Sequence, residues 1–239
     1  LFLTERVNVH YGDLNAAGSY FVMALLMAVG LAIRARRLPW LISVGLLGCA
    51  VWVSGSRMAV MAGMLALVLP AGARTWRTHR GGLRGTTLAA ALLLALLAAL
   101  AAYGIPERGN QRSAATAAHV RWELARTSLR MTEANPAFGV GIGRFYSRSG
   151  EFSSPELLKS FPPAVHENAH NNFLQILAEL GIVGFSVMMW LLWTAAGYGR
   201  RLLGADMHDA LRWGLMTGLS AFVLSWLGGH PLLIDEPAF

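Results

Sequence analysis

The stretch "HNNFLQILAELGIVGFSVMMWLLWTAAG" (residues 170–197) decides the fold class, because a helix built from its apolar part is long enough to cross a bilayer. The composition agrees, since 55% hydrophobic and 14% charged residues with a mean hydropathy of +0.47 exclude an ordinary soluble domain. Similar runs recur, and we predict six membrane spans, at about 17–33, 39–54, 57–72, 86–103, 172–197 and 210–229. The sequence therefore predicts an all-α polytopic membrane protein.

Arginines indicate how these spans are oriented. Three short basic loops follow alternate spans: "RARR" (34–37), "RTWRTHRGGLR" (74–84) and "GRR" (199–201). All three lie on one side if six spans alternate, and the positive-inside rule makes that side cytoplasmic. The tight hairpin "SGS" (54–56) and the long segment 104–171 are then external, as are both ends of the chain. Loops beyond about 60 residues are exempt from the rule, so the arginines of the long segment do not oppose this topology.

This topology divides the chain into three regions. We expect four transmembrane helices with short loops in 1–103, a large external loop in 104–171, and two transmembrane helices with an external C-terminal stub in 172–239. The chain begins at Leu1 without a signal-peptide pattern, so we interpret it as an internal piece of a longer protein. Its one cysteine, Cys49, lies in an apolar run, and we expect it to serve packing rather than a disulfide or a metal site.

The long external segment has a pattern of its own. Residues 113–136, "SAATAAHVRWELARTSLRMTEANP", predict a helix that ends at Pro136. A turn follows in "FGVGIGRF" (138–145), whose three glycines permit backbone angles that other residues resist. The stretch "SSPELLKSFPPAV" (153–165) reads as a loop with a short helical stretch at most.

A zinc protease pattern overlaps the opening stretch. His166, Glu167 and His170 spell H-E-x-x-H, which on a helix places two imidazoles one turn apart. The context opposes a helix there, because Pro162 and Pro163 lie just upstream and asparagines interrupt the region.

A better helix start lies at Asn171 or Asn172. We expect Asn172 to be the N-cap, with Gln175 as its capping-box partner. His170 then precedes the helix. A third zinc ligand is also missing, because Glu179 is on the same helix and "HD" (208–209) falls on the cytoplasmic side. A zinc metalloprotease is therefore the less favoured alternative, and we expect no metal.

Three residues on the external side form a candidate site. Arg57 begins an apolar run, where a charge is costly unless it pairs or reaches the headgroups, so it is either functional or an interfacial arginine. Arg121 lies on the loop helix, where a surface arginine is also ordinary. His170 lies just before the fifth span. Its imidazole either accepts a proton from an attacking hydroxyl or is simply a hydrogen-bonded side chain. We expect free N–H groups at the helix N-terminus (171–173) to add an anion site, which suits a phosphate or diphosphate headgroup.

The segment "HNNFLQILAELGIVGF" resembles the signature of the bacterial O-antigen ligase family. That signature has His, then Asn, Ser or Gln, nine residues, Gly, two residues and Gly; His170, Asn171, Gly181 and Gly184 fill the four positions. Further stretches resemble the family in the same order: "YGDLNAAGSY", "SGSRMAV", "RWELARTSLRMTEANPAFGVGIGRF" and "GGHPLL". Family members have about a dozen spans, so the resemblance implies that N-terminal transmembrane helices are absent from this chain.

The resemblance implies a GT-C-like fold and an inverting, metal-independent glycosyltransferase without a cofactor. The protein would lie in the bacterial inner membrane with its active site facing the periplasm. The donor would be a glycan on undecaprenyl diphosphate, bound by Arg57 and Arg121, with the helix N-terminus neutralising charge on the leaving diphosphate. His170 matches the family's essential histidine, and the favoured acceptor is a hydroxyl of lipid A core.

The neighbours of His170 receive supporting roles. We expect Glu167 and Asn168 to orient the histidine or the acceptor, and Asn171 to support the site from the signature. Gly181 and Gly184 are expected to permit close helix packing rather than to touch substrate.

Other functions stay open at this point. Polysaccharide polymerases and protein O-oligosaccharyltransferases share the donor chemistry and differ in the acceptor, which no quoted residue identifies. A non-enzymatic polysaccharide transporter is a further alternative from a different class.

Overall fold

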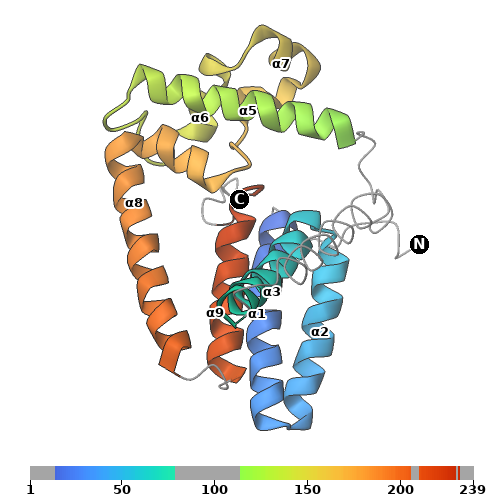
Figure 1. The fold of residues 1–239 in the computed structure, drawn as a ribbon. Coiled ribbons are helices and arrows are strands. Elements are labelled where there is room, and N and C mark those ends of the chain that lie inside the picture. The colour runs from blue at the N-terminus through green and yellow to red at the C-terminus, as the bar shows by residue number, and fades with distance from the viewer. Residues whose placement is uncertain (1–13, 79–113, 206–209, 230, 232–239) are drawn as a thin grey trace, which may run out of the picture. The chain divides into compact units, whose positions relative to one another are not determined.

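A computed structural model describes residues 14–78, 114–205, 210–229 and 231. The chain divides into two compact units, Leu1–Asn110 with Leu202–Ser225 (unit 1) and Gln111–Arg201 with Trp226–Phe239 (unit 2). All regular elements in the described ranges are helices, which confirms the all-α prediction (Figure 1). They are α1 (Leu14–Ala35), α2 (Leu38–Ser54), α3 (Arg57–Thr78), α5 (Ala114–Ala134), α6 (Phe145–Phe152), α7 (Pro155–Ser160), the 3₁₀ helix η1 (Pro162–His166), α8 (Asn172–Ala205) and α9 (Ala210–Ser225).

In unit 1, α1 packs against α2, α3 and α9. Small residues permit the closest of these contacts, because a Cβ atom on Gly30 of α1 would lie 2.9 Å from the Cα of Gly214 on α9. Close approach at small residues replaces the hydrophobic driving force as the basis of helix association in a membrane. A cluster of buried side chains fills the remaining space: Val22, Leu26, Val51, Ala59, Ala66 and Ala221.

The helices correspond to five of the six predicted spans. Two of them, Asn15–Ala35 and Asn172–Gly199, are long and apolar enough to cross a membrane, whereas Leu38–Ser54, Arg57–Leu67 and Ala210–Ser225 are shorter apolar helices. The predicted span at 86–103 lies outside the described residues. The six-span topology, the three regions and the GT-C-like arrangement therefore stay predictions.

The tight connection between α2 and α3 forms as predicted. Gly55 ends α2 in the left-handed conformation, with φ of 61°, and its N–H donates to the carbonyl of Trp52. Ser56 then caps α3, because its Oγ accepts from the N–H of Ala59 at 3.3 Å. Helix α1 contacts this turn directly, since a Cβ atom on Gly18 would lie 2.5 Å from that of Ser56. Arg57 therefore begins α3 from a buried, tightly held turn.

Unit 2 is built on α5. This helix ends at Ala134, just before Pro136, as the sequence predicts. One buried cluster joins Val120 and Leu124 of α5 to residues of α7 and η1, and a second joins Met131 to Phe145 of α6 and Ala178 of α8. The prediction of a loop with at most a short helical stretch at 153–165 understates the order, because α7 and η1 both form there.

Helix α8 is broken near its start. Gly181 has φ of 64° and ψ of −168°, so a first helical segment ends before it and a long second segment follows (Figure 1). The loop after α5 fills the break. The N–H groups of Val140 and Gly141 donate to the carbonyls of Ala178 and Glu179, and the N–H of Ile182 donates to the carbonyl of Pro136. The loop thus provides hydrogen-bond partners for backbone groups that the break leaves without one. A break in a helix that crosses a membrane needs such partners, because lipid offers none.

Candidate functional site

His170 lies between η1 and α8, outside any helix. Its φ of 50° places it in the left-handed region, which few residues other than glycine adopt. Glu167 before it is extended, with φ of −142° and ψ of 150°. The helical geometry that H-E-x-x-H needs for zinc is therefore absent at 166–170. His166 instead stacks on Tyr146, with the ring centroids 5.7 Å apart.

The start of α8 corrects one part of the sequence prediction. Asn171, rather than Asn172, is the N-cap, because its Oδ1 accepts from the N–H of Leu174 at 3.2 Å. The Asn172 side chain is fully buried, and its amide has no hydrogen-bond partner in the described part of the chain. Gln175 does not complete a capping box with Asn172 and bonds other side chains instead.

One of the N–H groups of the predicted anion site at 171–173, that of Asn172, is engaged within the protein. The N–H of Asn172 donates to the carbonyl oxygens of Trp226 and Gly229, at 3.0 and 3.1 Å, and that of Leu174 is taken by Asn171. Two carbonyl oxygens directed at the helix end oppose an anion there. The N–H of Asn172 is therefore not free to bind a diphosphate, and the anion site at 171–173 stays a prediction.

A chain of polar side chains leads from His170 into the protein. The Nε2 atom of His170 lies 3.6 Å from Oε1 of Glu167, and the same oxygen accepts from the N–H of Asn168 at 3.0 Å. The Oδ1 of Asn168 accepts from Nε2 of Gln175 at 3.0 Å, and that Nε2 lies 3.3 Å from Oε1 of Glu179. Gln175 and Glu179 are only 1% and 2% exposed. Glu167 is thus close enough to orient His170, and Asn168 is linked to the histidine through Glu167.

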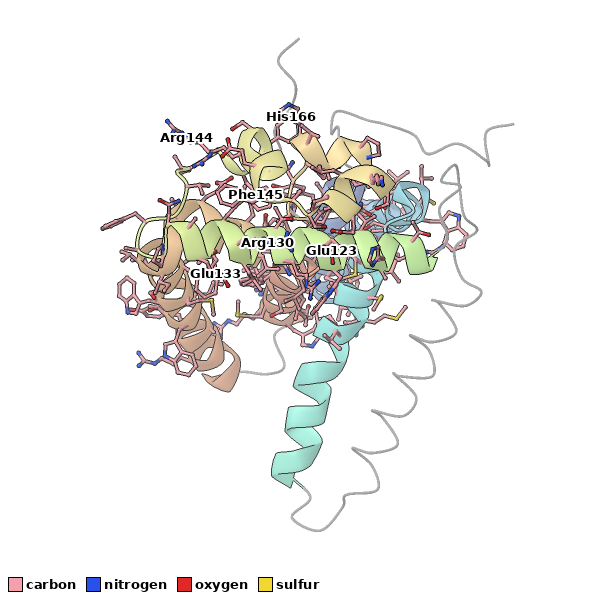
Figure 2. All side chains as sticks on the ribbon, turned by 90° about the horizontal axis from the view of Figure 1, so that it is seen from above. Glu123, Arg130, Glu133, Arg144, Phe145 and His166 are labelled. Atoms are coloured by element: carbon pink, nitrogen blue, oxygen red, sulfur yellow. The ribbon has the colours of Figure 1, made fainter. Side chains whose placement is uncertain are left out.

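Glu179 also holds the Gly-rich loop. Its two carboxylate oxygens accept from the N–H groups of Gly143 and Phe145, at 2.9 and 3.1 Å. These bonds cap the start of α6 from another helix. Phe145 then points inward beside α5, whereas the neighbouring Arg144 points away from the protein (Figure 2).

The Gly-rich loop is not a phosphate cradle. Such a cradle needs free backbone N–H groups. Here the N–H groups of Gly139, Val140, Gly141 and Arg144 all donate to backbone carbonyls, and that of Gly143 donates to Glu179. The loop therefore closes the break in α8 and does not offer these donors to a ligand.

The two arginines of the candidate site belong to different units. Arg57 is half-buried at the start of α3 in unit 1, and Arg121 is exposed on α5 in unit 2. Arg121 has no hydrogen bond or ion pair within the described ranges. Two other arginines of α5 are engaged, because Arg126 pairs with Glu123 at 3.3 Å and Arg130 donates to the carbonyl of Phe152. Arg121 is therefore available to a ligand in a way that these arginines are not.

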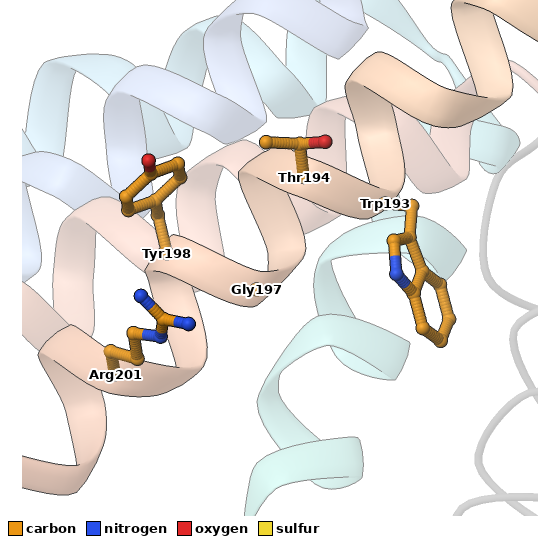
Figure 3. A pocket seen from close by; sticks show the side chains of 5 residues that line it. All are labelled: Trp193, Thr194, Gly197, Tyr198 and Arg201. Carbon is orange, nitrogen blue, oxygen red and sulfur yellow. The ribbon is translucent and has the colours of Figure 1, made fainter.

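A pocket of about 540 Å³ lies elsewhere, on the second segment of α8 (Figure 3). Its lining residues share one helix: Trp193, Thr194, Gly197, Tyr198 and Arg201. The guanidinium of Arg201 lies 5.9 Å from the ring centroid of Tyr198. None of these residues belongs to the polar chain around His170, so this pocket is separate from the candidate site.

The signature glycines have different roles. A Cβ atom on Gly181 would lie 2.4 Å from the carbonyl oxygen of Ala137, so the close approach is to loop backbone rather than to another helix. A Cβ on Gly184 would meet the side chain of Leu180 in its own helix. Gly181 also supplies the break in α8.

Sequence reasoning missed Gln175 and Glu179 as members of this site. Their signal was present, because two polar residues four positions apart in the apolar run "FLQILAEL" share one helix face. The sequence pattern favours Gln175 as a capping-box partner and presents Glu179 only as a candidate zinc ligand. Their spacing does not show which partners they bond, namely the Gly-rich loop for Glu179 and the segment 168–169 for Gln175.

Comparison with known proteins supports one family. The model of the family described as O-antigen ligase matches residues 22–189, a range that includes Arg57, Arg121 and His170. Neither the curated proteins nor the solved structures gave a match to the chain.

Proposed function

Since the chain belongs to the O-antigen ligase family, we propose that it transfers a glycan from undecaprenyl diphosphate to an acceptor hydroxyl at the periplasmic face of the inner membrane. The favoured acceptor is lipid A core. The observation that carries this proposal is the setting of His170, which has a left-handed backbone, a side chain that is 26% exposed and a carboxylate, that of Glu167, 3.6 Å from its Nε2.

In this proposal His170 acts as general base. Its imidazole takes the proton of the acceptor hydroxyl as the oxygen attacks the anomeric carbon, and the bond from that carbon to the diphosphate breaks. Undecaprenyl diphosphate leaves with the bonding electron pair, and the anomeric configuration inverts. Glu167, 3.6 Å from Nε2, stabilises the imidazolium that forms.

Arg57 and Arg121 are the proposed diphosphate ligands. Guanidinium groups bind phosphate oxygens through paired N–H donors and do not lose their charge. The fixed turn at Ser54–Ser56 supports this role for Arg57, and the absence of a competing partner among described residues supports it for Arg121. In this proposal the two arginines stabilise the charge on the leaving diphosphate.

The test is a transfer assay with purified protein in vesicles. The donor is an undecaprenyl diphosphate glycan with a labelled sugar, and the acceptors are lipid A core, a second donor molecule and a serine-rich protein, each alone. We expect the label on lipid A core. Label on a second glycan or on protein would keep the donor chemistry and replace the acceptor, whereas no transfer to any of them would contradict the proposal.

A further inference from the structure

We infer that Gln175 and Glu179 are positioning residues that set the place of His170 from inside α8. The inference rests on the proposed function, because it assigns these residues to the same reaction. They lie one helical turn apart on the buried face of the first α8 segment, between the Gly-rich loop and the segment 167–170.

Burial of these two side chains calls for a reason. An apolar pair at these positions would suit the apolar run and avoid the cost of desolvating a carboxylate and an amide. The cost is offset here because Glu179 receives three donors, from Gly143, Phe145 and Gln175. A satisfied buried network of this kind fixes geometry more than it adds stability.

The loop does not need Gln175 to stay attached. Four backbone hydrogen bonds already join it to α8, from Val140, Gly141, Ile182 and Val183. Gln175 instead contacts the segment before α8, at 168–169. Its Nε2 donates to Oδ1 of Asn168, and its Oε1 accepts from the N–H of Ala169 at 3.4 Å.

These contacts end at the two residues before His170. Fixing the backbone of Ala169 restrains the left-handed conformation of His170, which costs free energy and persists only where neighbours enforce it. Fixing Asn168 restrains Glu167 as well, because the Asn168 N–H donates to the Glu167 carboxylate. The Gln175 amide therefore helps to position the base and its carboxylate, together with Ser149, whose Oγ accepts from the N–H of Glu167 at 3.1 Å.

The experiment removes that amide with little change in volume. Gln175→Met keeps an unbranched side chain and leaves the Glu179 carboxylate in place, and Glu179→Gln is the second variant. Thr127→Val is the matched control. It removes a buried side-chain hydrogen bond in unit 2, from the Thr127 hydroxyl to the carbonyl of Glu123, but Thr127 lies on α5. Each variant is assayed for glycan transfer in vesicles, with kcat and the KM for labelled donor measured separately, and its thermal unfolding midpoint is compared with that of the control.

We expect Gln175→Met to lower kcat by about 10- to 100-fold, as misplacement of a reacting group by about 1 Å does, with the donor KM within twofold of wild type. We also expect Asn168→Ala to lower kcat, and the double variant Asn168→Ala/Gln175→Met to be no slower than the slower single variant, because both remove one shared contact. Glu179→Gln should lower kcat in the same way; if it does not fold, Gln175→Met alone decides.

Three results would overturn the inference: a kcat within threefold of wild type in Gln175→Met, a raised donor KM without a change in kcat, or effects of the two single variants that multiply. Failure of the proposed function looks different, because either the wild type would then transfer no glycan or His170→Ala would transfer as much as the wild type. Loss of transfer in His170→Ala together with full activity in Gln175→Met would remove only the positioning role.

Discussion

His170 and His166 share one sequence pattern and have different surroundings. His170 is followed by the cap of α8 and faces Glu167, whereas His166 is exposed and stacks on Tyr146. We therefore expect His170→Ala to lower surface glycan transfer by about 100-fold or more, as loss of a general base does, and His166→Ala to leave it unchanged. The measurement is surface glycan on cells that carry each variant as their sole copy. Equal loss in both variants would favour a reaction that needs the whole H-E-x-x-H set.

Arg121 and Arg126 allow a similar comparison on one helix. Both are exposed on α5, and only Arg126 is paired with a carboxylate. We expect Arg121→Ala to raise the donor KM about tenfold or more, since a charge-assisted bond to phosphate is worth about 1.5–3 kcal/mol, whereas Arg126→Ala changes it little. Steady-state transfer at varied donor concentration measures this. A normal KM in Arg121→Ala would remove this arginine from the diphosphate site.

The sequence predicts the local setting of His170 but not which asparagine caps α8. The placement of His170 before a helix followed from asparagines and prolines, which have strong local preferences. The choice of Asn171 over Asn172 as cap did not, because both have the same preference and a contact with the distant Trp226 and Gly229 carbonyls engages Asn172.

At the scale of elements, the break in α8 is the feature that joins the Gly-rich loop to this helix. Gly181→Ala places a side chain in a left-handed conformation and against the carbonyl of Ala137, so we expect it to destabilise the fold by about 1–3 kcal/mol. Gly197→Ala on the same helix is the control. Open space surrounds Gly197, so this change should be neutral or stabilise by up to about 1 kcal/mol. Thermal unfolding in detergent measures both, and equal midpoints would contradict the proposed need for glycine at 181.

Helices with local signals were predictable, and those with distant partners were not. Pro136 marks the end of α5, and apolar runs mark α1 and α8. The short helix α6 has serines and a glycine in eight residues and forms with a carboxylate from α8 at its N-terminus. The break at Gly181 likewise depends on the loop that fills it. This loop, at 135–143, lies about 40 residues earlier in the chain.

At the scale of the whole molecule, the predicted topology has a direct test. The chain has one cysteine, so Cys49→Ala provides a background for single labels. We expect a membrane-impermeant maleimide to label Ser147→Cys from the periplasmic side of intact spheroplasts, and Arg36→Cys only after permeabilisation, because short arginine-rich loops stay in the cytoplasm. Labelling of Ser147→Cys only after permeabilisation would reverse the topology and move the site to the cytoplasm.

The central claim is that His170 drives glycan transfer from a lipid diphosphate, and one measurement tests it most directly. Wild-type protein and His170→Ala are placed in vesicles with an undecaprenyl diphosphate glycan whose sugar is labelled and with lipid A core, and labelled product and free undecaprenyl diphosphate are measured in one turnover. We predict equal amounts of both products with the wild type and neither with His170→Ala. Equal product formation by the two proteins would contradict the account.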